Sequence, residues 1–413
     1  MEEVDKSYEE EVNNLKRKYK LKEMELNALL EITQAINDNL SEENLFKIYN
    51  FSLRANLNIN KLAMFVFDEI WICKVAFGLD DSFRRTRLDP LFLDLKTNTL
   101  ISDLNVTDKF KGFDLVIPVS HKDRLLALVF VDEVDEGEQE TNITFIHALS
   151  NLIIVAVENK KLARKELRQE AFRKELEIAK DVQNFLFPNE LPYGIRLKIE
   201  ASYLPHHTIG GDYYDYIPIN QNQFLICVAD VSGKGVPAAI LMSNFQASLR
   251  TLVRQTPNLT EIIEELNFQI LENAKGENFI TFFVAIYDHS LNTMVYVNSG
   301  HNPPILADGK NGLQFLESGS TVLGMFHPLP FINEGFITDL NEFLLLLYTD
   351  GLTETFNDQE EEYGVDRLKS FVDKHRQEDL KVMHKNLLDE IDGFKGNNRY
   401  HDDLTAVSCR VEP

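Results

Sequence analysis

Apolar residues recur at helical spacing through the first part of the chain and then give way to short apolar runs. From Glu2 to about Asn39 the apolar positions predict a long helix. Ser41 stands where the N-cap of a second, shorter helix is expected, running through Tyr49. Four strands are predicted next, at 62–67, 70–76, 115–119 and 124–131, the last two joined by a polar turn at 120–123. This order indicates a sheet with flanking helices.

From Glu138 the pattern becomes helical again, and no helix breaker occurs before Pro188. Between 158 and 181 the apolar residues thin to a narrow stripe among Lys, Arg and Glu, which is too thin for a globular core. The stripe favours a coiled-coil dimer seam or a signalling linker, and a plain solvated linker is the alternative. We expect an N-terminal helix at 1–25, a sensor domain at 26–160, a helical or coiled-coil linker at 161–192 and a C-terminal domain at 193–413.

The C-terminal section alternates apolar runs with amphipathic stretches. Helices are predicted at 238–255 and 260–274, and two strands that flank 288–292 are expected to pair as a hairpin. Further strands are predicted at 224–229, 305–306 and 343–348 and at the end of the chain. This alternation indicates a layered domain of sheets and helices.

The charge balance restricts the ligands that the protein can attract. Acidic residues outnumber basic ones by 66 to 42, for a formal charge of −24, which disfavours nonspecific binding to nucleic acid or anionic membrane and favours metal cations. The chain opens with charged residues, and no apolar run reaches the roughly 18 residues of a membrane span, so we expect a cytoplasmic protein. Three scattered cysteines in apolar surroundings indicate buried thiols.

Carboxylates recur at the boundaries of predicted strands, beside small or turn residues. They are Asp212, Asp230, Asp350 and the pair Asp402 and Asp403. Each alone fits an ordinary turn, but four such clusters brought together would repel one another without counterions. Hard divalent cations supply that compensation, and two of them can activate a water for in-line displacement at phosphorus. The pattern therefore predicts phosphate-ester hydrolysis without a protein nucleophile.

These carboxylates lie in motifs that occur in order between about Glu175 and Val411. The motifs are Gly-Gly-Asp-Tyr-Tyr-Asp, Ala-Asp-Val-Ser-Gly-Lys-Gly, Ser-Gly-His-Asn-Pro-Pro, Tyr-Thr-Asp-Gly-Leu-Thr-Glu and His-Asp-Asp-Leu-Thr, preceded by a helical stretch that ends in Phe-Leu-Phe-Pro. The set resembles the bacterial SpoIIE/RsbU-type phosphatases of the metal-dependent PPM (PP2C-like) class. The resemblance implies a serine/threonine protein phosphatase with an αββα sandwich and two Mn²⁺ or Mg²⁺ ions. It also suggests a phosphoserine or phosphothreonine of an anti-sigma-factor antagonist as the substrate.

The resemblance assigns roles by motif position. Asp230 would bridge both metals, with the carbonyl of Val231 as a further ligand, and Asp230 and Asp350 would act through the activated water. Asp350 and Asp402 would complete the main site. Asp212 would hold a metal directly or through water, and Asp403 is the less favoured member of its pair.

Two departures from the eukaryotic branch of the class affect the chemistry. Val231 and Ser232 stand where many of those enzymes have a His, so no side chain is an obvious acid for the leaving alkoxide. A phosphate-binding Arg is also missing, and His206 and His207 occupy its place; for His207, phosphate contact and a loop role are both open. His301 is interpreted as a turn residue, and Lys234 as a solvent-facing turn lysine.

The first module resembles a GAF sensor domain in its order of two helices, a mostly antiparallel sheet with an Ile-Pro-Val strand, and a closing helix that ends in Val-Glu-Asn-Lys-Lys-Leu. This resemblance implies a small-molecule or protein signal, or a role in dimerisation. Trp71, Cys73, Phe92 and His121 are interpreted as packing or loop residues. The expected fold class is α+β: a GAF-like α/β domain, a long linker helix and a PP2C-like sandwich.

We expect a homodimer in which the helix at about 145–187 transmits the signal. The rival hypothesis is a noncatalytic signalling scaffold whose C-terminal domain only binds a partner.

Overall fold

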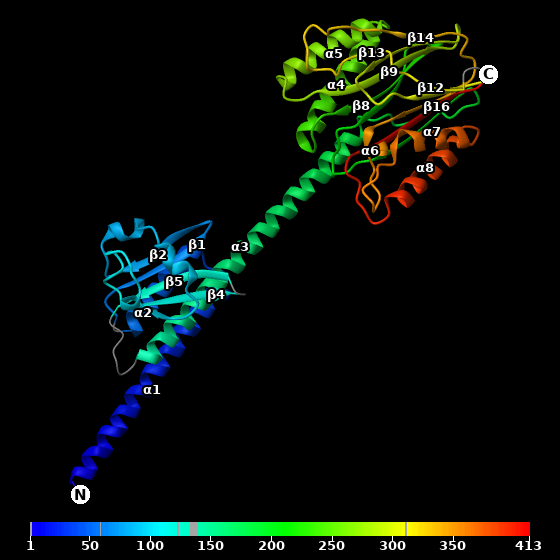
Figure 1. The fold of residues 1–413 in the computed structure, drawn as a ribbon. Coiled ribbons are helices and arrows are strands. Elements are labelled where there is room, and N and C mark those ends of the chain that lie inside the picture. The colour runs from blue at the N-terminus through cyan, green and yellow to red at the C-terminus, as the bar shows by residue number, and fades with distance from the viewer. Residues whose placement is uncertain (1, 58, 122–123, 133–138, 310–311) are drawn as a thin grey trace. The chain divides into compact units, whose positions relative to one another are not determined.

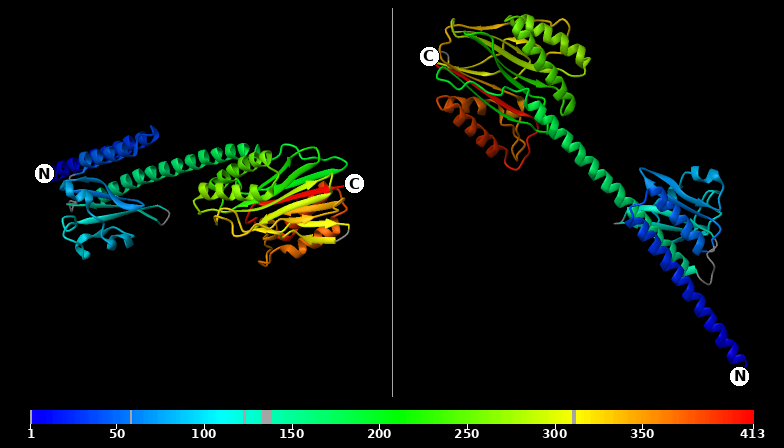
Figure 2. Two further views of the ribbon diagram at one scale, coloured as in Figure 1. Left: turned by 90° about the horizontal axis from the view of Figure 1, so that it is seen from above. Right: turned by 180° about the vertical axis from the view of Figure 1, so that it is seen from behind.

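A computed structural model describes residues 2–57, 59–121, 124–132, 139–309 and 312–413 (Figure 1; further views in Figure 2). The chain divides into two compact units, Met1–Glu170 and Ala171–Pro413, called here the N-terminal and C-terminal units. Helix α3 (Gln139–Asn184) is continuous across this division, as the uninterrupted helical pattern predicts. The predicted linker at 161–192 therefore begins inside a helix that also belongs to the N-terminal unit.

The N-terminal unit is built on one antiparallel sheet with the strand order β2-β1-β5-β4-β3. Its strands are β1 (Leu62–Asp68), β2 (Ile70–Phe77), β3 (Thr99–Leu100), β4 (Leu115–His121) and β5 (Arg124–Val131). The helices are α1 (Glu2–Asn37), α2 (Glu42–Asn56) and the start of α3, with short 3-10 turns η1 (Asp81–Arg85), η2 (Pro90–Asp94) and η3 (Ile101–Asp103). The four predicted strands are confirmed, and Ser41 caps α2 by accepting the Asn44 N–H at 3.3 Å. Two residues of the predicted turn, 122–123, lie outside the described residues.

The two faces of this sheet are covered differently. One face packs against α1, α2 and α3 in an aliphatic core. The other face carries a cluster of phenylalanines, namely Phe65, Phe83, Phe92, Phe110, Phe113 and Phe130. Neighbouring rings in the cluster meet edge to face, as for Phe92 and Phe130 at 4.8 Å between centroids. Phe92 and Cys73 are thus core residues, as predicted, whereas His121, expected in the turn at 120–123, is an exposed residue at the end of β4. The GAF-like assignment stays a prediction.

The C-terminal unit is an αββα sandwich. One sheet has the order β13-β10-β9-β8-β7, with β14 also on β10, and the other has the order β12-β11-β15-β16-β6. The strands are β6 (Leu197–Leu204), β7 (Tyr213–Pro218), β8 (Gln223–Val231), β9 (Ile280–Asp288), β10 (Thr293–Ser299), β11 (Ile305–Asp308), β12 (Gly312–Phe315), β13 (Gly319–Ser320), β14 (Gly335–Ile337), β15 (Phe343–Tyr348) and β16 (Leu404–Val411). The helices are α4 (Val236–Gln255), α5 (Leu259–Ala274), α6 (Asp350–Thr353), α7 (Gly364–His375) and α8 (Leu380–Lys395).

Three apolar cores hold these layers together. The first joins α4 and α5 to the first sheet, the second lies between the sheets, and the third joins α6, α7 and α8 to the second sheet. Figure 1 shows α4 and α5 on one side of the strands and α7 and α8 on the other. The predicted helices and the hairpin of β9 and β10 are confirmed. All three cysteines are buried free thiols, also as predicted.

Helix α3 changes character along its length. Its first part contributes Phe145, Leu149 and Ile153 to the core of the N-terminal unit. Farther along, Leu167 and Ile178 are exposed, at 65% and 64%. Within the described residues one segment, Asn142–Asn184, has the length and composition of a membrane span, but half of its most apolar window is buried inside the protein. Such a helix is weak support for membrane insertion, because core helices share this composition.

Candidate active site at the acidic edge of the sandwich

Strand ends from both sheets deliver the predicted carboxylates to one edge of the sandwich. Asp212 directly precedes β7, and Asp230 lies near the end of the neighbouring strand β8. In the second sheet Asp350 follows β15 after one residue, and Asp402 and Asp403 precede the adjacent strand β16. The sequence predicted this meeting only through the strand-end pattern. In the structure Asp230 interacts electrostatically with each of the other four carboxylates.

Asp212 connects the loops of both sheets. Its side chain is buried, and one carboxylate oxygen, Oδ2, accepts hydrogen bonds from the hydroxyls of Thr405 and of Thr349, the latter at 2.8 Å. Burial raises the pKa of Asp212 well above its usual range, and the charges of Asp230 and Asp403 add to the rise. Neither threonine was identified from the sequence as a site residue. Asp212 therefore holds the loop before β7 to Thr349 and Thr405 by hydrogen bonds.

Asp403 closes the loop that carries Asp212. One of its carboxylate oxygens accepts the His206 N–H at 2.7 Å and the other accepts the Gly211 N–H at 2.7 Å. The approach is so close that a Cβ at Gly210 would lie 2.3 Å from Oδ2 of Asp403, and a Cβ at Gly351 would lie 2.1 Å from its carbonyl oxygen. These contacts favour a loop-closing role for Asp403 over direct coordination of a metal.

Asp230 and Asp350 carry the least compensated charge of the site. The pKa of Asp230 is raised to about 7, first by burial and then by repulsion from Asp350, Asp402 and Asp403. Burial also raises the pKa of Asp350, with a second contribution from Asp402. A cation at this edge would reverse both effects.

Lys234 is an exposed turn lysine, as predicted, and it also supplies a positive charge to this edge. Its ammonium lies 2.7 Å from Oδ2 of Asp402 and donates to the His401 carbonyl at 2.7 Å. Both side chains of the ion pair remain partly in solvent, Lys234 at 45% and Asp402 at 41% exposure. Such an exposed pair contributes little to stability.

The donor set fits hard cations, although no metal cage is preassembled. Among the described residues, no three His, Cys, Asp or Glu side chains are grouped closely enough to hold an ion. Asp230, Asp350 and Asp402 nevertheless present carboxylate oxygens to one region, which is the chemistry that Mg²⁺ and Mn²⁺ prefer. Gly211 keeps the Val231 carbonyl uncovered, because a Cβ there would lie 3.0 Å from that oxygen. PP2C-like phosphatases depend on metal ions.

His301 lies in the bend between β10 and β11, as predicted, and its side chain also makes contacts that the sequence did not predict. The ring is buried, with Nδ1 2.8 Å from the Thr281 hydroxyl and Nε2 3.0 Å from the Tyr348 carbonyl. Burial lowers the pKa of His301 to about 4, so the neutral ring donates from Nε2 and accepts at Nδ1. Thr281 pairs with Asp230 across β8 and β9, and Tyr348 lies two residues before Asp350. His301 thus ties the two sheets together.

The end of α3 also contacts the acidic edge. The side-chain amide of Gln183 donates to the Gly210 carbonyl at 2.8 Å and accepts the Gly210 N–H at 3.3 Å. Gln246 on α4 donates to the Leu186 carbonyl at 3.2 Å. Gly210 lies two residues before Asp212. A displacement of the helix end would therefore act on the loop that carries this carboxylate.

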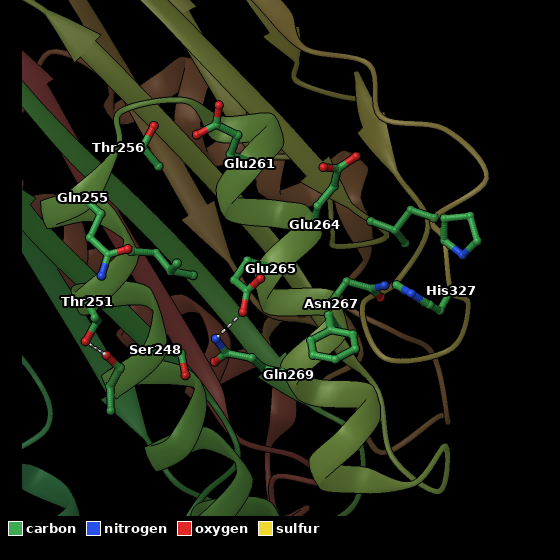
Figure 3. Close-up of a pocket in the computed structure, with 15 residues that line it drawn as sticks. Ser248, Thr251, Gln255, Thr256, Glu261, Glu264, Glu265, Asn267, Gln269 and His327 are labelled. Carbon is green, nitrogen blue, oxygen red and sulfur yellow. Dashed lines mark hydrogen bonds between the residues drawn. The ribbon is translucent and has the colours of Figure 1, made fainter.

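The most prominent groove of the C-terminal unit lies elsewhere. A space of about 1000 Å³ is lined by α4, α5 and the segment 327–329, and Figure 3 shows its side chains, including Glu261, Glu264 and Glu265. None of the five motif carboxylates lines it. We assign the chemistry to the acidic edge, because the groove brings together none of the residues that the motifs single out.

Comparison with known proteins finds relatives of the C-terminal unit. The model of the SpoIIE family (Stage II sporulation protein E) matches residues 220–412. The phosphoserine phosphatase RsbU of Bacillus subtilis is 28% identical over 245 residues, which is 59% of this chain and 71% of that protein. RsbP, another phosphoserine phosphatase of Bacillus subtilis, is 27% identical over 191 residues, which is 44% of this chain and 46% of that protein. The chain thus spans less than half of the length of RsbP.

Among solved structures, the SiaA-PP2C domain of Pseudomonas aeruginosa aligns with a TM-score of 0.53 at 18% identity, covering 59% of this chain and 99% of that domain. The C-terminal unit thus has the fold of a PP2C domain. Residues 220–412 match the SpoIIE family model, and the chain is a protein phosphatase similar to RsbU.

Proposed function

We propose that this protein hydrolyses phosphoserine or phosphothreonine in a partner protein with the aid of two Mn²⁺ or Mg²⁺ ions. Asp230, Asp350, Asp402 and the Val231 carbonyl would hold the ions, with Asp212 as an indirect ligand. Bound ions would supply positive charge to a water nucleophile and to the phosphoryl oxygens. The observation that carries the proposal is the convergence of uncompensated carboxylates from both sheets, which raises the pKa of Asp230 to about 7 through burial and through repulsion from its neighbours.

The chain's own residues give the site its shape. Thr349 and Thr405 hold Asp212, and the backbone amides of His206 and Gly211 hold Asp403. These hydrogen bonds leave Asp230 and Asp350 as the carboxylates with the greatest need of a counterion.

The test is hydrolysis of a phosphoserine peptide and of p-nitrophenyl phosphate by the full chain, with Mn²⁺, with Mg²⁺ and with EDTA. Asp230→Asn and Asp350→Asn should each lower kcat by at least about a hundredfold, and the exposed Asp389→Asn on α8 is the control. Absence of turnover in both metals, with Asp230→Asn indistinguishable from wild type in metal binding, would favour the noncatalytic scaffold.

We further propose that the N-terminal unit, as a GAF-like module, regulates the phosphatase through α3. The two hydrogen bonds between Gln183 and Gly210 support this route, because they join the helix to the Asp212 loop. Gln183→Ala should change the Mn²⁺ concentration needed for half-maximal activity, whereas exposed Gln359→Ala should not. Equal metal dependence in wild type and Gln183→Ala, together with no effect of deleting residues 1–150, would exclude the route.

Exposed apolar residues on the helices support a homodimer. On α1, Leu15 and Tyr19 are 71% and 73% exposed, and on α3 Leu167 and Ile178 are similarly exposed. Sedimentation equilibrium of the wild type and of a Leu167→Glu, Ile178→Glu double variant tests whether these positions form a coiled-coil seam. The double variant should be monomeric. An unchanged mass would place any dimer contact elsewhere.

The substrate and the signal follow from the family. RsbU and RsbP are named phosphoserine phosphatases, and we propose an anti-sigma-factor antagonist as the phosphoprotein and the cytoplasm as the location. The N-terminal unit would receive a small-molecule or protein signal. Phosphoproteomics before and after loss of the protein tests the substrate: a phosphoserine that accumulates on such an antagonist supports it.

A further inference from the structure

The proposed function assigns no side chain to bind the phosphoryl group of the substrate. A phosphoryl group carries about two negative charges, and it must approach an edge that already holds five carboxylates. Phosphate sites in proteins are commonly built with Arg or Lys. The Arg that serves this purpose in the eukaryotic branch is absent here, and His207, which stands in its place, is exposed.

The basic side chains of the C-terminal unit differ in whether they are available to bind a phosphoryl group. Arg250 is committed to buried Asp215, to which it donates two hydrogen bonds at 2.7 and 2.9 Å. Lys234, in contrast, sits between Asp402 and the His401 carbonyl with 45% of its side chain exposed. Its charge also acts on Asp350, where it opposes the rise in pKa that burial and Asp402 cause. Lys234 is thus a cation that faces both the carboxylates and solvent.

We propose that Lys234 binds the phosphoryl oxygens of the substrate, and that its ion pair with Asp402 holds the ammonium beside the site until a metal ion takes over the charge of that carboxylate. This inference rests on the proposed function. It gives Lys234 a role in substrate binding, and leaves activation of water to the carboxylates and their ions.

The local backbone suits this role. Lys234 lies between Gly233 and Gly235, which adopt φ values of +92° and +73° in the turn between β8 and α4. From this turn the lysine reaches the loop of Asp402. Because an exposed ion pair is weak, exchange of the carboxylate for a phosphate costs little. A charge-assisted hydrogen bond to phosphate is stronger than the pair it replaces.

The test measures binding of inorganic phosphate to the Mn²⁺-loaded full chain by calorimetry, beside hydrolysis of p-nitrophenyl phosphate. Lys234→Gln should weaken phosphate binding and raise KM by about tenfold each, with a smaller change in kcat. Lys234→Arg should restore most of the affinity. Lys385→Gln, which removes an exposed positive charge on α8, is the control for net charge and should match wild type. Mn²⁺ binding without phosphate should be equal or tighter in Lys234→Gln.

Three results would overturn the inference. Phosphate affinity could be unchanged in Lys234→Gln, or Mn²⁺ binding could weaken and account for the whole loss, which would make Lys234 a residue that only positions Asp402. Exposed Arg399, three residues before Asp402, could show the tenfold effect instead when changed to Gln. A wild-type protein that binds phosphate through Lys234 but hydrolyses neither substrate would support this inference and refute the proposed function.

Discussion

Asp230→Asn tests the electrostatic account of the acidic edge without any substrate. In the metal-free protein the pKa of Asp230 is raised to about 7, against 3.8 for an ordinary Asp, by burial first and then by neighbouring carboxylates. Because the folded pKa lies above the unfolded one, ionisation of Asp230 destabilises the folded protein. The cost is absent below about pH 4, grows between pH 4 and 7, and is complete above pH 7.

The magnitude follows from linkage. A rise of about three pKa units corresponds to roughly 4 kcal/mol of unfolding free energy at high pH. At pH 5 less than half of this cost has developed, so the gap between variant and wild type should widen by roughly 2.5 kcal/mol from pH 5 to pH 8. The variant should be the more stable protein at pH 8 in EDTA. Mn²⁺ at about a thousand times its Kd should remove this advantage, because it adds about 4.1 kcal/mol to wild type only.

Differential scanning calorimetry of the full chain can measure this change in the stability of the C-terminal unit. The single tryptophan, Trp71, lies in the N-terminal unit, so its fluorescence identifies the transition of that unit and leaves the other transition to the phosphatase domain. Asp389→Asn controls for the loss of one negative charge. Parallel stability profiles for wild type and Asp230→Asn between pH 5 and pH 8 would refute the reasoning, as would equal stabilisation of both by Mn²⁺.

Three further predictions concern the stability of the two units. Asp215→Asn should cost about 3 kcal/mol in urea unfolding of the C-terminal unit, because it breaks the pair between a fully buried carboxylate and Arg250; a loss below 1 kcal/mol would contradict this. Phe110→Ala should cost about 3 to 5 kcal/mol in the transition reported by Trp71 fluorescence, and an effect on the other unit alone would contradict it. Since burial lowers the pKa of His301 to about 4, wild type should lose roughly 2 to 3 kcal/mol as the pH falls from 7 to 4.5, and His301→Gln should escape this loss in urea titrations at both pH values.

The sequence predicted the site to the extent that strand ends can be read locally. The apolar run into Asp230 and the buried strand before Asp350 place both residues at strand termini, and both strands are present. The strands β12, β13 and β14 were not predicted, because two to four residues are too few to show a period. Their neighbours in the sheets, rather than their own sequence, make them strands.

The contacts that depend on the pairing of two sheets could not be predicted. Thr349 and Thr405 reach Asp212 only because β15 and β16 lie side by side and face the first sheet. His301 bridges β9 and the end of β15, which are 67 residues apart between Thr281 and Tyr348. Local spacing contains no signal for such partners, which is why His301 and Lys234 were both interpreted as turn residues.

The hydrogen bonds at the edge divide the five carboxylates into two groups. Asp212 and Asp403 receive protein donors, two hydroxyls and two backbone amides respectively, so the loops that they join are held without any cation. Asp230, Asp350 and Asp402 repel one another; Lys234 forms an ion pair with Asp402 alone, and its charge also acts on Asp350. Asp402 accepts a backbone N–H only from its neighbour Asp403, at 2.9 Å, and so joins no distant loops. Metal binding should therefore change the charge of loops that hydrogen bonds already hold in place. Since burial and repulsion raise the pKa of Asp230 and of Asp350, a metal ion must displace protons from them, and metal affinity should rise with pH through the neutral range.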